Sequence, residues 1–220
     1  MMSAMGFILR KNTSLQGLTP DHLHREVGLV LTDSCRNLQR LALCHRHLER
    51  KISTSLFLRA AATNMPLLPE LMLRFSRHAR RVLKMQTLLI TLLTKEDAFR
   101  HLEVLHLAGT FGCPFTRDTA AFLPSLHTLA LRNHQPQHGV TACCFELAYF
   151  LPALPALRVL QLSVEDDEAS ESAGMCFNWD QDPNITRITL PHLEELAMDR
   201  CCSKLRVPAL RKLVGCTIDR

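Results

Sequence analysis

The sequence predicts an α/β solenoid, in which short parallel strands lie side by side and a return segment follows each strand. The first observation is a recurring phrase with the spacing L-x-x-L-x-L, which is clearest in Leu102–Leu107. The second is its period, because successive phrases begin 17 to 36 residues apart. The third is physical: a single unit of this size cannot bury its own leucines, whereas stacked units bury them against one another.

Seven segments carry the phrase, and each is predicted to form one strand. They are Leu38–Leu43, Leu68–Leu73, Leu102–Leu107, Leu126–Leu131, Leu157–Leu162, Leu193–Met198 and, more weakly, Leu210–Gly215. We expect these strands to form a parallel sheet on the concave side, with helices covering the convex side. The alternative is an ordinary α/β domain of separate βαβ units, which would need no recurring phrase.

The segments between the phrases supply the expected helices. Thr19-Pro20-Asp21 begins the first one, with threonine as N-cap, proline in the first turn and an acid beside the positive end of the helix dipole. Apolar spacing predicts the helices in order at 19–31, 50–63, 75–93 and 116–123, and CCFELAYFL at 143–151 suits a short buried helix or turn. Residues 1–18 are expected to be an irregular lead-in, and 164–182 an acidic loop.

The length and composition are those of a globular intracellular protein with one sizeable domain or two small ones. The chain has 220 residues, 47% of them hydrophobic, and a formal charge of +5. Nine cysteines form no C-x-x-C pair, which fits a reducing compartment. The apolar-rich segment 82–93 is too short to span a bilayer. We therefore expect a cytoplasmic or nuclear protein with no membrane association.

The phrases resemble those of leucine-rich repeat proteins. Their irregular lengths, and the prolines before the strands in Leu123-Pro124-Ser125-Leu126, Leu154-Pro155-Ala156-Leu157 and Leu190-Pro191-His192-Leu193, resemble the repeat region of fungal F-box/leucine-rich-repeat proteins. The resemblance covers about residues 20–218 and implies one repeat domain, at 19–220, of about seven irregular units. In that family the F-box binds the adaptor of a ubiquitin ligase, and the repeats hold the substrate.

No F-box-like run of the form Leu-Pro-x-Glu-Leu/Ile-x-x-x-Ile/Leu occurs within residues 1–40. The resemblance therefore implies a chain with only the substrate-holding part, either as a fragment, a diverged paralogue or a stand-alone recognition module. A non-functional repeat fragment is kept as an alternative. The leading hypothesis is a non-catalytic scaffold for a protein partner, with a ubiquitin ligase adaptor as a second partner implied by the resemblance.

A solenoid of this kind would bind its partner through the residues that alternate with the strand leucines. Counting these positions predicts three rows across the concave face, with Arg74, Ala108 and Arg132 in the third row. The residues predicted to contact the partner are Arg40, Met72, Arg74, Val104, His106, Thr128, Arg132, Gln161 and Glu195. This mixed, mildly apolar surface suits a protein or peptide better than a phosphate backbone, which favours a run of one sign.

A basic helix face gives the alternative hypothesis of a nucleic-acid-associated module. Its residues are Arg77, Arg80, Arg81 and Lys84. No aromatic side chains interleave them to stack on bases, so nucleic acid is the less favoured partner and a solvated convex face is expected.

Catalytic and metal sites have little support in the sequence. The chain contains no G-x-S-x-G, no H-E-x-x-H and no glycine-rich phosphate loop. The pairs His45-x-His47 and His134-x-x-x-His138 have spacings that a metal could use, but Pro136 interrupts the second pair. We therefore expect no enzyme activity, no cofactor and no metal.

Overall fold

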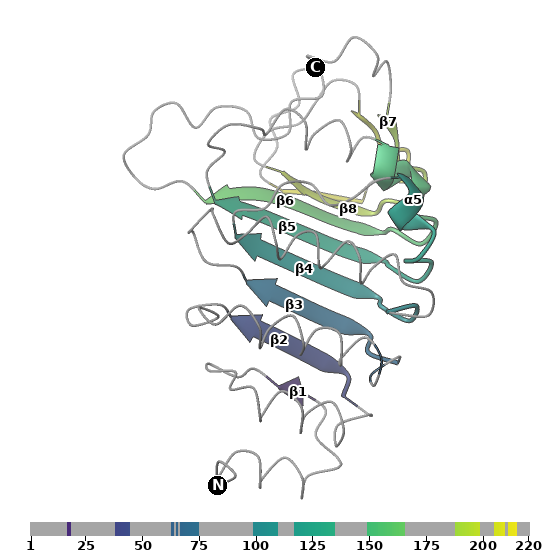
Figure 1. The fold of residues 1–220 in the computed structure, drawn as a ribbon. Helices are drawn as coiled ribbons and strands as arrows, with labels where there is room; N and C mark the ends of the chain where they lie inside the picture. The colour runs from purple at the N-terminus through teal and green to yellow at the C-terminus, as the bar shows by residue number, and fades with distance from the viewer. Residues whose placement is uncertain are drawn as a thin grey trace, which may run out of the picture.

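The computed structural model shows one parallel sheet whose strands follow the chain order (Figure 1). It describes residues 17–18, 38–44, 63, 65, 67–74, 99–109, 117–134, 149–165, 188–198, 205–209 and 211–214. The strands of this sheet are β1 (Gly17–Leu18), β2 (Arg40–Cys44), β3 (Glu70–Arg74), β4 (Val104–Gly109), β5 (Thr128–His134), β6 (Val159–Glu165), β8 (Glu195–Met198) and β10 (Lys212–Val214).

Smaller elements lie beside the second half of the sheet. Two short strands, β7 (Ile188–Thr189) and β9 (Leu205–Arg206), pair in parallel as a separate ribbon. The helical elements of the described residues are α5 (Arg117–Ala120) and the 3₁₀ turn η1 (Leu151–Ala153). Both lie at the edge of the sheet where the strands begin (Figure 1).

The predicted parallel strands are confirmed, because every recurring phrase contains a strand of the sheet. Two boundaries differ from the prediction. The segment 17–18, inside the expected irregular lead-in, forms β1 by pairing with the edge of β2. Glu165, expected in the acidic loop, is the last residue of β6, since β5 continues far enough to pair with it through His134.

Only some of the expected helices lie among the residues that the structure describes. α5 lies inside the helix predicted at 116–123, and η1 follows directly after two helical residues at 149–150. The helices predicted at 19–31 and 75–93 lie outside the described residues, as does all of 50–63 except Thr63. The pairing of β7 with β9 was not predicted, because two-residue strands leave no periodic pattern in a sequence.

The core consists of layers of leucines held in register from strand to strand. The second strand position forms one continuous row: Leu41, Leu71, Leu105, Leu129, Leu160 and Leu196. All six are buried, with exposed fractions of 2% or less. Leu73, Leu107, Leu131, Leu162 and Met198 form a parallel, equally buried row two residues later. The strands that carry both rows, which are β3, β4, β5, β6 and β8, therefore bury one face through alternate residues.

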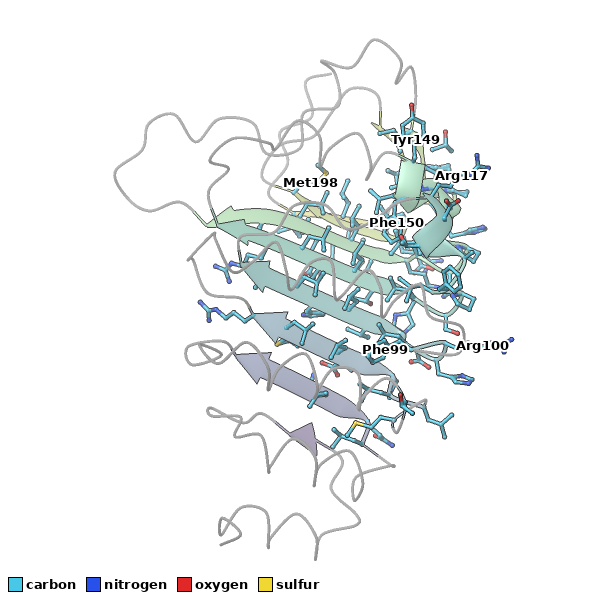
Figure 2. All side chains as sticks on the ribbon, viewed as in Figure 1. Phe99, Arg100, Arg117, Tyr149, Phe150 and Met198 are labelled. Atoms are coloured by element: carbon cyan, nitrogen blue, oxygen red, sulfur yellow. The ribbon has the colours of Figure 1, made fainter. Side chains whose placement is uncertain are left out.

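A turn that begins with a buried residue leads into each of five strands. The first residue of the turn is apolar and at most 4% exposed, and the residues at this position are Met65, Phe99, Leu123, Leu154 and Leu190. In four turns its carbonyl oxygen accepts a hydrogen bond from the amide three residues later, for example from Leu102 to Phe99 at 2.9 Å. Phe99 lies at the strand-start edge of the sheet, and Arg100 extends outward beside it (Figure 2).

Shared carbonyl groups join the strands where they begin. The oxygens of Pro69, Glu103, His127, Arg158 and Glu194 each accept hydrogen bonds from two successive amides of the next strand, at 2.7–3.0 Å. For example, Glu103 accepts from His127 at 2.9 Å and from Thr128 at 3.0 Å. The joint between β2 and β3 differs, because Pro69 has no amide hydrogen and only Glu70 donates to Gln39, at 3.2 Å.

Candidate interaction surface on the sheet

The residues that alternate with the buried leucines form the opposite face of the sheet, which we call the exposed face. The strand register arranges them in three rows across the strands. The first row is Arg40, Glu70, Val104, Thr128, Val159, Glu195 and Lys212. The central row is Ala42, Met72, His106, Ala130, Gln161, Ala197 and Val214. The third row, as far as it is described, is Cys44, Arg74, Ala108, Arg132 and Ser163. Every residue predicted to contact a partner lies in one of these rows.

The first row has an ion pair at each end and half-buried, uncharged residues between them. Arg40 Nε lies 2.6 Å from Glu70 Oε1, and Lys212 Nζ lies 3.1 Å from Glu195 Oε2. The hydrogen bond and the negative charge of Glu70 raise the pKa of Arg40. Because both pairs join neighbouring strands, their charges balance locally, and such exposed pairs contribute little to stability.

The central row is mostly made of small or apolar side chains. Ala42 is buried, whereas Met72, Ala130 and Ala197 are half-buried. Val214 is 51% exposed, so an apolar surface continues to the last strand of the sheet.

His106 is the titratable residue of the central row. It lies in register between Met72 and Ala130 and is half-buried. Partial burial lowers its pKa, the negative charge of Glu70 partly opposes this effect, and the positive charge of Arg40 adds to it. His106 therefore holds its proton less strongly than an exposed histidine does.

The third row carries two exposed arginines. Arg74 on β3 and Arg132 on β5 are both in register with Ala108 on β4, which separates them. Across the described part of the three rows, four cationic side chains face two carboxylates.

A second charged row, at the residue just before each strand, was missed by the sequence reasoning. His127 Nε2 lies 3.4 Å from Glu103 Oε2, and its Nδ1 lies 3.0 Å from the Thr128 hydroxyl. The Glu194 carboxylate lies 3.5 Å from Arg158 and 3.7 Å from Arg211, on the strands at either side. The polar residue that follows the first leucine of the phrase by one position could have indicated this row. Its compensated charges suit a stabilising role better than a binding role.

The other predicted sites lie mainly outside the described residues. The basic face of Arg77, Arg80, Arg81 and Lys84 is outside them, as are His45, His47 and His138. Among the described residues, no group of three His, Cys, Asp or Glu side chains is placed to hold a metal ion. In the same part of the chain, no helix has the length and apolar character needed to cross a membrane.

Comparison with known proteins adds no relative. No protein-family model, no curated protein and no solved structure matches this chain.

Proposed function

We propose that the chain is a leucine-rich-repeat solenoid that works as a non-catalytic scaffold for a protein partner, with the exposed face as its concave binding surface. The proposal is supported by the in-register rows, since one register runs from β2 to β10 and places outward residues of seven strands on one surface. A surface of apolar, polar and cationic side chains over a rigid leucine core is typical of protein recognition.

The resemblance to F-box/leucine-rich-repeat proteins extends the proposal to a cellular role. In this reading the exposed face holds a substrate for ubiquitination, and an adaptor of the ubiquitin ligase is a second partner. The adaptor would bind elsewhere, because the exposed face provides one continuous surface rather than two.

Affinity capture from a fungal cell extract tests the scaffold. The test variant carries Arg74→Glu, His106→Glu and Arg132→Glu, all on the exposed face. The control variant carries Arg100→Glu, His101→Glu and Arg117→Glu, which exchange the same residue types at exposed positions away from this face. Circular dichroism and thermal unfolding verify that both variants fold.

The scaffold proposal expects the wild type and the control variant to retain the same specific proteins, and the test variant to lose them. A ligase adaptor among the captured proteins would support the role in ubiquitination. If the folded test variant retains the same proteins as the wild type, the exposed face is not the binding surface. If none of the three retains a specific protein, a non-functional repeat fragment becomes the better account.

A further inference from the structure

We propose that the exposed face releases its protein partner on acidification, because His106 lies at the centre of this face and is covered by uncharged residues of the partner. This inference rests on the proposed function and specifies the regulation of the same surface. A protonated imidazole at this place would bring a charge into an interface whose centre is otherwise uncharged.

His106 has uncharged neighbours at the four adjoining positions of the face. Along β4 these are Val104 and Ala108, two residues before and two residues after it. Across the strands His106 is in register with Met72 and Ala130. All four neighbours are half-buried, as His106 is. A partner that lies across β3, β4 and β5 therefore covers the imidazole together with uncharged side chains.

The carboxylate that acts on His106 is that of Glu70, one strand away on β3, and it is already paired. Its Oε1 lies 2.6 Å from Nε of Arg40. The positive charge of Arg40 opposes the effect of Glu70 on the pKa of His106, and burial, the largest cause, lowers this pKa. Among the described residues, none forms a hydrogen bond or an ion pair with the imidazole. The neutral form is thus favoured before a partner binds.

The other charged residues around His106 lie at diagonal positions or further along the strands. Arg74 on β3 and Arg132 on β5 are each one strand away and two residues further along, a diagonal of about 7–8 Å. In the next row, His134 on β5 is in register with Glu165 on β6. Both arginines already take part in an interaction and can keep it, because the inference uses the proton of His106 alone.

A partner over His106 would remove more water from the imidazole, and this would disfavour the charged form further. The pKa of His106 would therefore be lower in the complex than in the free protein, so binding would release a proton. The affinity is then complete above the pKa of the free protein and falls as the pH decreases through it. Since that pKa lies below about 6.5, one proton can weaken binding at most about tenfold between about pH 7.5 and about pH 5.5.

Isothermal titration calorimetry tests the acid-sensitive release. The probe is the most abundant protein whose retention depends on the exposed face in the capture experiment, purified before use. The wild type should bind it about two- to tenfold more weakly at about pH 5.5 than at about pH 7.5. Titrations near pH 6, in two buffers with different ionisation enthalpies, should show the release of up to about one proton on binding.

Three variants assign the effect to His106. His106→Gln has a side chain that does not titrate, and His106→Lys has one that is charged at both pH values. Whatever their affinity at the higher pH, both variants should lose the pH dependence and the proton release of the wild type. His106→Lys should bind more weakly than His106→Gln at both pH values, because it brings a charge into the interface. His101→Gln, at an exposed turn position, is the matched control and should keep the pH dependence of the wild type.

The inference is overturned if the wild type binds equally well at the two pH values, or if folded His106→Gln keeps the wild-type pH dependence. It is also overturned if binding strengthens at the lower pH through His106, as a carboxylate of the partner would cause. The capture experiment keeps this failure distinct from that of the scaffold. If captured proteins depend on the exposed face and one of these results is found, only the acid-sensitive release is wrong. If no captured protein depends on this face, both proposals are wrong.

Discussion

The amide nitrogen of Leu102 donates a hydrogen bond to the carbonyl oxygen of Phe99 at 2.9 Å, across a turn in which Phe99 has a φ of 56°. This left-handed conformation is costly for a bulky residue. The equivalent Leu154 is extended, with a φ of −88°, and a proline follows it. Proline disfavours helical conformations of the residue before it, and the Phe99 turn has Arg100 at that position instead. The turn before β4 thus differs from its counterpart before β6.

This difference predicts opposite effects of two reciprocal substitutions. Arg100→Pro should lower the free energy of unfolding by more than about 1 kcal/mol, because it restricts Phe99 to conformations that the turn does not use. Pro155→Arg should change stability less, since the extended conformation of Leu154 is open to any residue. Urea unfolding measures both. Equal effects of the two variants would show that the conformation of Phe99 is not coupled to residue 100.

Phe99 should also be a large contributor to stability through its side chain. It is fully buried, with an exposed fraction of 0%. Phe99→Ala should cost about 3–5 kcal/mol, because it removes a buried ring and leaves a cavity. Phe99→Leu should cost much less, as leucine occupies the same position in three other turns. Chemical denaturation of the two variants provides the comparison, and a loss below about 1 kcal/mol for alanine would contradict the packing described here.

The alternation of buried and exposed residues predicts a contrast between neighbouring strands. Leu129→Ala should lower the free energy of unfolding by about 2–5 kcal/mol, because Leu129 is fully buried between the leucines of β4 and β6. Gln161→Ala, on the exposed face of β6, should stay within about 0.5 kcal/mol of the wild type. Thermal unfolding of both variants is sufficient, and similar losses would mean that the strand register is wrong.

Stability should depend on pH through His106. Its pKa in the folded protein is lower than in the unfolded chain, so the unfolded chain binds the proton more readily. The contribution of His106 to the free energy of unfolding should therefore be fully present above the unfolded pKa of about 6.5. This contribution should be lost as the pH falls from there towards the folded pKa. His106→Gln should reduce this dependence, and His101→Gln, at an exposed turn position, is the matched control. Unchanged pH dependence in His106→Gln would refute the assignment.

The Glu194 carboxylate between Arg158 and Arg211 should contribute a small, salt-dependent amount. Glu194→Gln should lower the free energy of unfolding by about 0.2–1 kcal/mol at low salt, since both arginines are largely exposed. At about 1 M salt, where the Debye length is about 3 Å, most of this difference should disappear. Unfolding experiments at the two ionic strengths check it, and a salt-independent loss would indicate packing rather than charge.

The strands could be predicted because the two leucines inside each phrase follow the period of a strand with one buried face. Leu105 and Leu107 are such a pair, and both are buried. The left-handed Phe99 and the strand β1 could not be predicted. Phe99 adopts its conformation in response to the turn around it, and β1 exists because β2 offers an edge for pairing, so neither leaves a local signal in the sequence.

The rows of the exposed face could also be predicted from the sequence. Once the phrases align, Arg74, Ala108 and Arg132 necessarily fall at one strand position, and the register places them side by side. The ion pairs were not predictable, because the distance between Arg40 and Glu70 depends on the rotamers of two long side chains. The lowered pKa of His106 follows from burial by its neighbours, which a spacing rule does not describe.

The missing amide hydrogen of Pro69 gives the sheet a preferred place to open. At this joint one hydrogen bond connects Gln39 to the next strand, whereas the following joints each have two at the same position. Local opening transitions begin where the fewest bonds must break together. We therefore expect β2 to separate first and β3 to β8 to open as one cooperative block. As a result, the amide of Glu70 should exchange with solvent deuterium before the amides of Val104, Thr128 and Val159.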